Sequence, residues 1–101
     1  MIARIWHGKT RASEADEYLE FLEQTGIPDY QHTQGNRGVY VLRNFDGDEA
    51  NFLLLSLWES EEDIQRFAGA DIQIARYYPG DEKYLLEMEP YVTHYEVLVS
   101  P

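Results

Sequence analysis

Three histidines are the side chains of this sequence best suited to proton transfer near neutral pH. They are His7, His32 and His94. His7 ends a strand-like segment, and side chains of a strand alternate between its two faces, so His7 shares a face with Ala3 and Ile5. We expect this face to lie beside the helical layer, which makes His7 the first candidate for a catalytic or ligand-orienting group. A strand-end histidine at the surface is the alternative.

The other two histidines are better explained without catalysis. His94 alternates with Val92, Glu96 and Leu98, a mixed face that favours contact with a neighbouring strand or an interface. His32 lies in a polar connection and is expected to be solvated. No two histidines have the spacing of a metal-ligand pair, and the sequence predicts no metal site. The acidic "DGDE" lacks the further oxygen ligands of a calcium loop and is typical of a hairpin turn.

Aromatic side chains are abundant, with two Trp, eight Tyr and four Phe. For any single aromatic residue, a place in the core or an interface is the more frequent role. Arg43 is suited either to a ligand carboxylate or to one of the many acidic side chains.

Composition indicates one globular domain, residues 1–101, with a real core, since 44% of the side chains are apolar. The chain has 8 basic and 19 acidic residues, a formal net charge of −11, so we expect no binding to nucleic acid or to an anionic membrane surface. It has no cysteine. No leader peptide is recognisable and no apolar run approaches the roughly 20 residues that span a bilayer, so a cytoplasmic protein is expected.

Hydrophobic periodicity and turn residues divide the sequence into alternating strands and helices. A strand is predicted over residues 2–7, and a helix over 13–25 that Ser13 caps and that Gly26 and Pro28 end. A second strand covers 39–45, a turn 46–50, and a third strand follows through Trp58. A helix capped by Ser60 ends at Gly69, residues 70–90 hold one or two helical turns broken at Pro79 and Gly80, and a last strand covers 91–99.

This order predicts an α+β, ferredoxin-like split βαβ fold, in which a four-stranded antiparallel sheet carries both helices on one face. The third strand, "NFLLLSLWES", is apolar on both of its faces. A second copy of the sheet would cover the open face, so we expect a homodimer. The alternative is that residues 70–90 fold over that face.

Several motifs resemble the antibiotic biosynthesis monooxygenase family: "MIARIWHGKT", "LWES" at a strand end, "EEDIQRF", "ARYYPGDEKYLLEMEP" and "HYEVL". The resemblance spans essentially the whole chain and implies a dimeric α+β barrel. Characterised members oxidise polycyclic phenols to quinones with molecular oxygen and no metal or flavin, and others degrade heme. The resemblance therefore implies no cofactor and a small aromatic molecule as the partner of the site.

The heme-degrading members use an asparagine, a tryptophan and an iron-binding histidine at places that His7, Phe67 and Tyr77 hold here. No matching histidine is present, so heme degradation is not expected unless Tyr77 binds iron as a phenolate. The same comparison implies that Phe67, Tyr77 and Tyr78 line a pocket and that Trp58 forms its floor.

Three functions are compatible with this sequence. The first is a cofactor-independent monooxygenase acting on a hydroxyaromatic or polyketide-like substrate, with His7 as the base and Tyr77 or Tyr78 orienting the phenol. The second is a non-catalytic small-molecule-binding or stress-related homodimer. The third is a structural dimer whose interior is filled by side chains.

Overall fold

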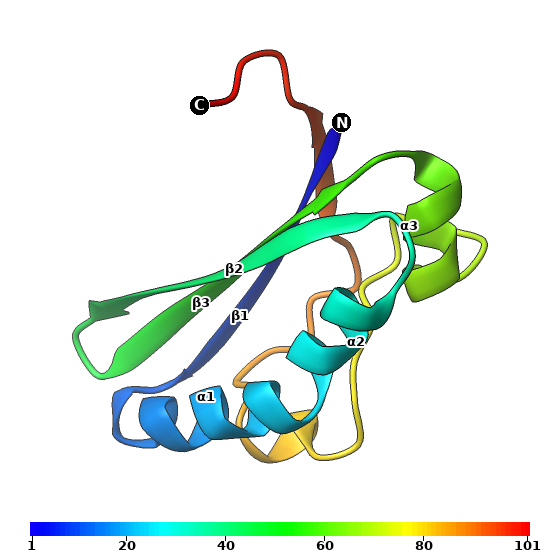
Figure 1. Cartoon of the computed structure of the whole chain (residues 1–101). Coiled ribbons are helices and arrows are strands. Elements are labelled where there is room, and N and C mark those ends of the chain that lie inside the picture. Colours follow the sequence, from blue (N-terminus) through cyan, green and yellow to red (C-terminus); the bar gives the residue numbers. More distant parts are fainter.

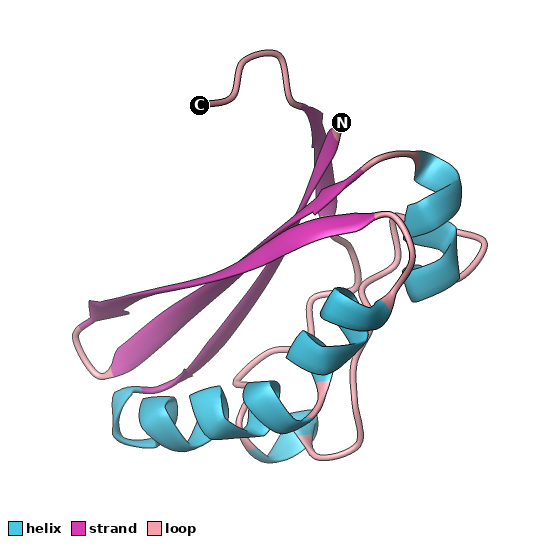
Figure 2. Ribbon diagram, viewed as in Figure 1, coloured by secondary structure: helices cyan, strands magenta, loops and turns pink.

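A computed structural model describes all residues from 1 to 101 as a sheet with helices on one side (Figures 1 and 2). In chain order the elements are β1 (Ile2–Arg11), the 3-10 turn η1 (Ala12–Glu14), α1 (Ala15–Gln24), α2 (Gly26–His32), β2 (Asn36–Asp46), β3 (Glu49–Trp58), α3 (Glu61–Ala68), the 3-10 turn η2 (Asp81–Lys83) and β4 (Thr93–Glu96). None of the helices is long and apolar enough to cross a membrane.

The sheet has the strand order β2-β3-β1-β4, and every neighbouring pair is antiparallel. The central strands are therefore β1 and β3, which pair over their whole length from Ile2 opposite Trp58 to Arg11 opposite Glu49. This arrangement confirms the predicted α+β, ferredoxin-like sheet. The strongly apolar third strand lies at its centre, as its sequence indicates.

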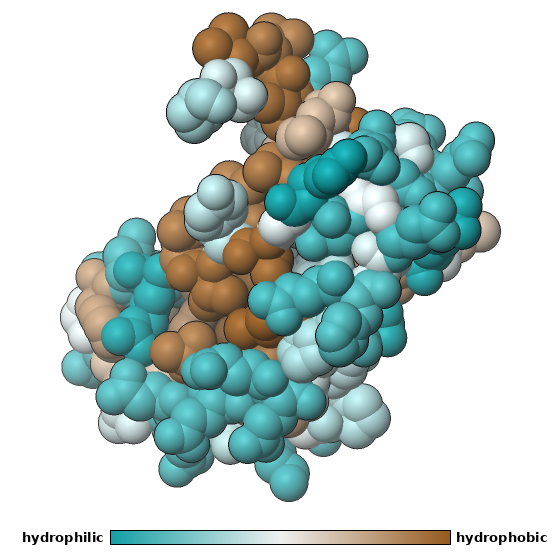
Figure 3. All heavy atoms as spheres, viewed as in Figure 1, coloured by the Kyte–Doolittle hydropathy of each residue, from teal (hydrophilic) through white to brown (hydrophobic).

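The two faces of the sheet carry different sets of side chains. Along β3, Phe52, Leu54, Ser56 and Trp58 are buried on the helix side, whereas the alternating residues Leu53, Leu55 and Leu57 are only half-buried. The opposite, open face carries Ile5, Tyr40, Leu42, Leu53, Leu55, Leu57 and Tyr95. Apolar side chains gather over the strands and on the C-terminal segment, while the helices below present polar ones (Figure 3). The residues 70–90 leave the β2 side of this open face uncovered, since Tyr40 remains 58% exposed and Leu42 46%.

Helix α1 packs on the sheet through Ala15, Tyr18 and Leu22, the face that its periodicity predicts. Its start differs from prediction, because Ser13 lies in η1 and no side chain caps α1. The expected stop at Gly26 is also wrong in part. A second helix, α2, begins there, and Pro28 is tolerated in its first turn because the missing N–H has no helical partner at that position.

The remaining elements match their predictions more closely. Ser60 caps α3 by accepting a hydrogen bond from the Asp63 backbone N–H, and the helix ends at Gly69. The strand expected over 91–99 is reduced to β4, and residues 97–101 extend away from the body of the molecule (Figure 1). Between α3 and β4, a long segment with one short turn, η2, crosses the ends of the helices. This segment forms one side of the candidate site.

Candidate functional site

A small cavity lies between the helices and the sheet, with Trp6, Tyr30 and Phe67 among the aromatic residues that line it. Arg76 and Asp81 supply its charged groups. Its free volume is about 20 Å³. That volume accommodates about one water molecule, so in this conformation the side chains fill the interior. A larger hollow of about 540 Å³ at the β2–β3 turn is open to solvent and has mostly polar walls.

The aromatic walls of the cavity come from distant parts of the chain. Trp6 lies on the helix-facing side of β1, where Gly8 leaves room for its ring: a Cβ atom on Gly8 would stand 2.3 Å from Trp6 Cη2. The Phe67 ring of α3 stacks on Tyr30 of α2, with ring centres 4.2 Å apart, and lies 5.6 Å from Trp58. Aromatic residues of four elements, β1, α2, β3 and α3, therefore come together around the cavity.

A buried acid lies at one end of the cavity. Asp81 is 3% exposed and accepts hydrogen bonds from the Tyr18 hydroxyl, at 2.8 Å, and from the Tyr78 backbone N–H, at 2.6 Å. Burial raises the pKa of Asp81 above its usual value, although both hydrogen bonds oppose the shift. Burial also raises the pKa of Tyr18, and the neighbouring Asp81 carboxylate adds to the effect. Asp81 is thus a carboxylate in the cavity with increased basicity.

The side of the cavity formed by residues 69–80 is attached to α2 through one carboxylate. Asp29 accepts hydrogen bonds from the Tyr78 hydroxyl, at 2.7 Å, and from Arg76 Nη2, at 3.1 Å. The Arg76 guanidinium lies 4.9 Å from the centre of the Phe67 ring and 4.8 Å from that of Tyr78, and it donates to the Phe67 carbonyl oxygen. We call Asp29, Arg76 and Tyr78 the latch, because their contacts close the cavity.

A second arginine is fully inside the protein. Arg4 is 1% exposed and donates to the carbonyl oxygens of Ile72 and Ile74 and to His94 Nε2. It takes part in none of the ion pairs of the molecule, and its Nε atom has no hydrogen-bond partner. Burial lowers the pKa of Arg4, and burial together with the Arg4 charge lowers the pKa of His94.

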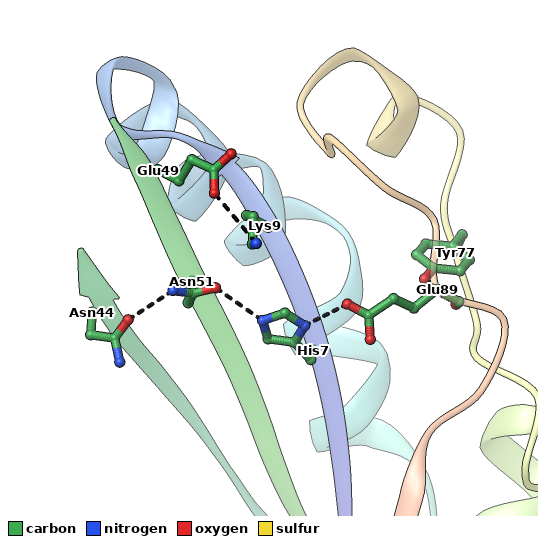
Figure 4. A network of polar contacts seen from close by, with 7 residues as sticks. All are labelled: His7, Lys9, Asn44, Glu49, Asn51, Tyr77 and Glu89. Atoms are coloured by element: carbon green, nitrogen blue, oxygen red, sulfur yellow. Dashed lines mark hydrogen bonds and ion pairs between the residues drawn. The ribbon is translucent and has the colours of Figure 1, made fainter. Parts of the chain in front are cut away.

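His7 lies outside the cavity. Trp6 occupies the helix-facing side of β1, so the period of two places His7 on the open face with Ile5. The expectation that His7 lies beside the helical layer is therefore wrong. Its Nδ1 atom is 2.5 Å from Glu89 Oε2, and its Nε2 atom is 3.1 Å from Asn51 Oδ1 (Figure 4).

The remaining predicted residues do lie around the cavity, at different distances from it. Phe67 and Tyr78 line it directly, and Trp58 is fully buried behind Phe67. Tyr77 packs edge-on against Trp6, with ring centres 6.0 Å apart, and its hydroxyl donates to the Glu89 carbonyl oxygen. Thus Phe67 and Tyr78 line the cavity as expected, whereas Trp58 and Tyr77 lie behind lining residues and do not border it.

Other residues of the site were not found by sequence reasoning. The alternation of bulky Trp6 with Gly8 in β1 is a usable signal, because a glycine two residues away leaves space for a large ring on the same face. Asp81 gives no such signal, since its burial depends on the path of the 69–92 segment. Arg43 pairs with exposed Asp16 at 2.9 Å, one of the two kinds of partner expected for it.

No protein-family model matches the sequence, and no curated protein matches it, but solved structures share the fold. A candidate antibiotic biosynthesis monooxygenase from Nitrosomonas europaea has a TM-score of 0.71 and 12% identity, over 98% of this chain and 100% of that one. Another from Bacillus cereus has a TM-score of 0.65 and 16% identity, over 99% and 95%.

The heme-degrader MhuD from Mycobacterium tuberculosis, solved with two hemes in its active site, has a TM-score of 0.63 and 17% identity, over 100% of this chain and 99% of that one. These likenesses confirm the predicted resemblance at the level of the fold. At these identities they carry no reaction over to this chain.

The residues of the cavity do not fit a heme. No histidine lines the cavity, and the histidine nearest to it in the sheet, His94, contacts Arg4. The Tyr77 hydroxyl is bonded to the Glu89 carbonyl, and burial raises the pKa of Tyr77 to about 12, which disfavours the phenolate that would bind iron. The Tyr78 hydroxyl is held by Asp29, and its pKa is likewise raised by burial.

Proposed function

We propose that this protein is a cofactor-independent monooxygenase that binds a small hydroxyaromatic molecule in the cavity between helices and sheet. The observation that carries the proposal is the presence, in one aromatic-lined cavity, of the buried carboxylate of Asp81 and the indole ring of Trp6. The carboxylate is a base for a phenolic proton, and the ring is a flat apolar wall for the substrate.

The proposed reaction balances without a further reductant. A phenol that carries a ring C–H para to its hydroxyl loses the hydroxyl proton, and the electron-rich anion then reduces oxygen. One oxygen atom becomes the second carbonyl of a quinone. The other leaves as water with the hydrogen atoms of the former O–H and C–H bonds. The protein has to hold the flat ring, accept a proton and exclude bulk water. The aromatic walls of the cavity are suited to holding the ring and to excluding water.

Ligand entry requires the latch to open, because the closed cavity has a free volume of only about 20 Å³. The latch residues Arg76 and Tyr78 lie on a segment without regular secondary structure, held to α2 at Asp29. Surface contacts of this kind contribute little stability, so the segment can move at small cost. In the proposal, an aromatic ligand takes the place of these side chains against Phe67.

The proposed active form is a homodimer in which two open sheet faces pack together. Leu53, Leu55 and Leu57 form the centre of that face, and Tyr40 and Leu42 extend it to β2. Burying a large apolar side chain contributes about 1.5–3 kcal/mol, so a face with this many of them favours a closed two-fold pair. His7 and its partner Glu89 lie on the same side of the sheet.

Oxygen uptake tests the proposed reaction. Purified protein is supplied with a panel of hydroxynaphthalenes and hydroxyanthracenes, and oxygen consumption and quinone absorbance are recorded. We expect turnover that falls at least about tenfold in Asp81→Asn, which removes the base. The matched variant is His7→Ala, which deletes the other candidate base from the opposite face and is expected to retain activity. Loss of turnover in His7→Ala together with full turnover in Asp81→Asn would make His7, and not Asp81, the base. No turnover with any phenol would refute the monooxygenase assignment.

A second function, ligand binding without turnover, is favoured by one observation. The cavity is filled by its own side chains, and its carboxylate is already occupied by two hydrogen bonds. A protein of this kind would show a ligand-dependent rise in melting temperature without product. A melting temperature that no aromatic compound changes would leave the third possibility, a structural dimer.

A further inference from the structure

A half-buried histidine of the sheet is in direct contact with a buried arginine. Arg4 of β1 and His94 of β4 lie opposite each other in the antiparallel pair, and Arg4 Nη1 is 3.1 Å from His94 Nε2. A guanidinium is always protonated and has only donors, so His94 Nε2 must be the acceptor and the ring proton must be on Nδ1. This contact therefore exists only while His94 is neutral.

Arg4 also holds the segment that forms one side of the cavity. Its guanidinium donates to the carbonyl oxygens of Ile72 and Ile74, in the second case at 3.2 Å. The backbone of residues 73–75 is joined to that of residues 90–92 by two further hydrogen bonds. The position of residues 72–75 therefore depends on where the Arg4 guanidinium lies.

Residues 72–75 lead directly into the latch. Arg76 comes next in the chain, lines the cavity, and donates to the Phe67 carbonyl oxygen and to Asp29. The chain between α3 and η2 has no helix or strand of its own. A segment with so little regular structure opens readily when one of its anchors is lost. A displacement at Arg4 would thus reach Arg76 through a short stretch of chain.

A proton on His94 would place two cations in contact in the interior. Glu61 of α3 is the acidic group whose charge acts on His94, and its effect is opposite to that of Arg4 and smaller. The Tyr30 hydroxyl of α2 lies beside Arg4 and stays neutral, since burial raises the pKa of Tyr30 to about 12. Two further acidic side chains on the adjoining elements are exposed, Asp71 and Glu96. Like charges in contact repel strongly where the dielectric constant is low.

We propose that His94 is an acid-sensitive gate of the cavity: when it takes up a proton, the Arg4 guanidinium is repelled, and residues 72–75 are released together with Arg76 of the latch. The proton binds the Nε2 lone pair that accepts from Arg4, so both ring nitrogens become donors and the contact cannot persist. The release of the segment needs no reaction. Its consequence for ligand entry rests on the proposed function.

The direction of the pH dependence follows from the contacts of His94. Burial and the Arg4 charge lower the folded-state pKa of His94 below its ordinary value of 6.5. The stability that the contact contributes is fully present above the unfolded pKa and is lost as pH falls through the folded pKa. The raised pKa of Asp81 has the opposite effect on global stability. Local measurements on the released segment are therefore needed to detect the gate.

Amide hydrogen exchange and the titration of His94, both followed by NMR on the full-length protein, test the gate. The amides of Ala75 and Val92 are the reporters, because each donates a backbone hydrogen bond between the segment and residues 90–92 or 73. After correction for intrinsic exchange, we expect their protection factors to fall at least about tenfold between about pH 7.5 and about pH 4.5. Protection of the β1–β3 pair should change much less. The midpoint of the fall should coincide with the titration of the His94 ring.

Two variants separate His94 from the other histidine that contacts this part of the chain. His94→Gln offers Arg4 an amide oxygen but does not ionise, so we expect protection at about pH 7.5 to be retained and its loss in acid to disappear. His7→Gln is the matched control, because His7 contacts Glu89 at 2.5 Å. It should keep the acid response. If His94→Gln does not fold, the agreement of the two midpoints in the unsubstituted protein decides.

Several results would overturn the gate. Protection that is independent of pH, or that falls at a midpoint different from that of His94, would contradict it. An acid response that persists in His94→Gln, or that disappears in His7→Gln, would do the same.

A probe that cannot ionise, 1-methoxynaphthalene, measures the consequence for the cavity. We expect its association rate to increase in acid for the unsubstituted protein and to be independent of pH for His94→Gln. Association that is equally fast at every pH in the unsubstituted protein would overturn a role of His94 in ligand entry. Absence of binding at every pH would contradict the pocket of the proposed function, while the exchange data would still decide whether His94 releases the segment.

Discussion

At the scale of single residues, the site depends on a glycine. A Cβ atom at Gly8 would lie 2.3 Å from Cη2 and 2.8 Å from Cζ3 of Trp6, closer than atoms can pack, so Gly8→Ala must displace the indole. We expect a loss of about 1–3 kcal/mol in the free energy of unfolding, measured by urea denaturation, and a changed near-ultraviolet circular dichroism spectrum.

Gly26→Ala is the matched control for this prediction. Its new Cβ would stand 3.4 Å from Tyr78 Cε2, an ordinary contact, and alanine favours a helix over glycine. We expect a change within about 1 kcal/mol, in the stabilising direction. Equal destabilisation by both substitutions would contradict the specific role of Gly8.

Asp81 makes the stability of the folded state depend on pH. The direction of this dependence is opposite to that of most carboxylates in folded proteins. Burial raises the folded-state pKa of Asp81 above its ordinary value of 3.8. The folded state then binds this proton more tightly than the unfolded state does. The contribution of Asp81 to stability is fully present below the unfolded pKa and is lost as pH rises through the folded pKa.

The variant Asp81→Asn should isolate that effect. Its amide can accept from the Tyr78 N–H and donate to the Tyr18 oxygen, so the local hydrogen bonds are retained in a group that does not ionise. Urea denaturation of both proteins between about pH 4 and about pH 7 gives the measurement. We expect the stability of Asp81→Asn relative to the unsubstituted protein to increase with pH; a constant difference would show that Asp81 ionises freely.

At the scale of elements, the latch decides whether the cavity opens. Tyr78→Phe removes the hydroxyl that donates to Asp29 at 2.7 Å and leaves the ring in place. Because a hydrogen bond to a charged group contributes about 1.5–3 kcal/mol, we expect faster amide hydrogen exchange in residues 70–80 and little change in the sheet. Tyr77→Phe, whose hydroxyl donates to the Glu89 carbonyl, is the control. It should loosen residues 84–92 instead, and identical exchange patterns would contradict a separate latch.

The elements also show which parts of the fold the sequence determines. Local signals with a direct physical cause were sufficient for the Ser60 cap, the Gly69 stop and the apolar third strand. The face assignment of β1 failed, because Arg4 and Thr10 are buried on the helix side while Ile5 is on the open side. Buried polar residues and a partly exposed apolar residue reverse the usual alternation of a strand. Only the residues packed against each face of β1 show which face is buried.

The segment 69–92 was the least predictable element for a related reason. It has little regular structure, and its place is fixed by side chains distant in sequence, such as Tyr18 to Asp81 and Asp29 to Tyr78. No local periodicity encodes such contacts. Of the aromatic residues that line the cavity, Phe67 and Tyr78 were found by resemblance, whereas Trp6, Tyr30 and the charged residues required the structure.

At the scale of the whole molecule, the open sheet face predicts a homodimer that a single charge should disrupt. Leu55, paired with Ile5 on one side and Tyr40 on the other, lies at the centre of that face. Leu55→Lys places a cation where two such faces would meet, and an unpaired charge at the centre of an interface is strongly unfavourable. We expect analytical ultracentrifugation to show a dimer for the unsubstituted protein and a monomer for Leu55→Lys.

Phe45→Lys provides the comparison for the dimer, because Phe45 is an equally apolar residue, 56% exposed, at the hairpin end and on the other side of the sheet. It should remain dimeric.

The dissociation constant of the dimer should also depend on ionic strength. Each copy carries a formal charge of −11, and two acidic molecules repel one another. Added salt screens this repulsion, so we expect the dissociation constant to fall as ionic strength rises. A monomer at every salt concentration would refute the pairing of the two sheets, and dissociation by Phe45→Lys alone would place the interface at the hairpin.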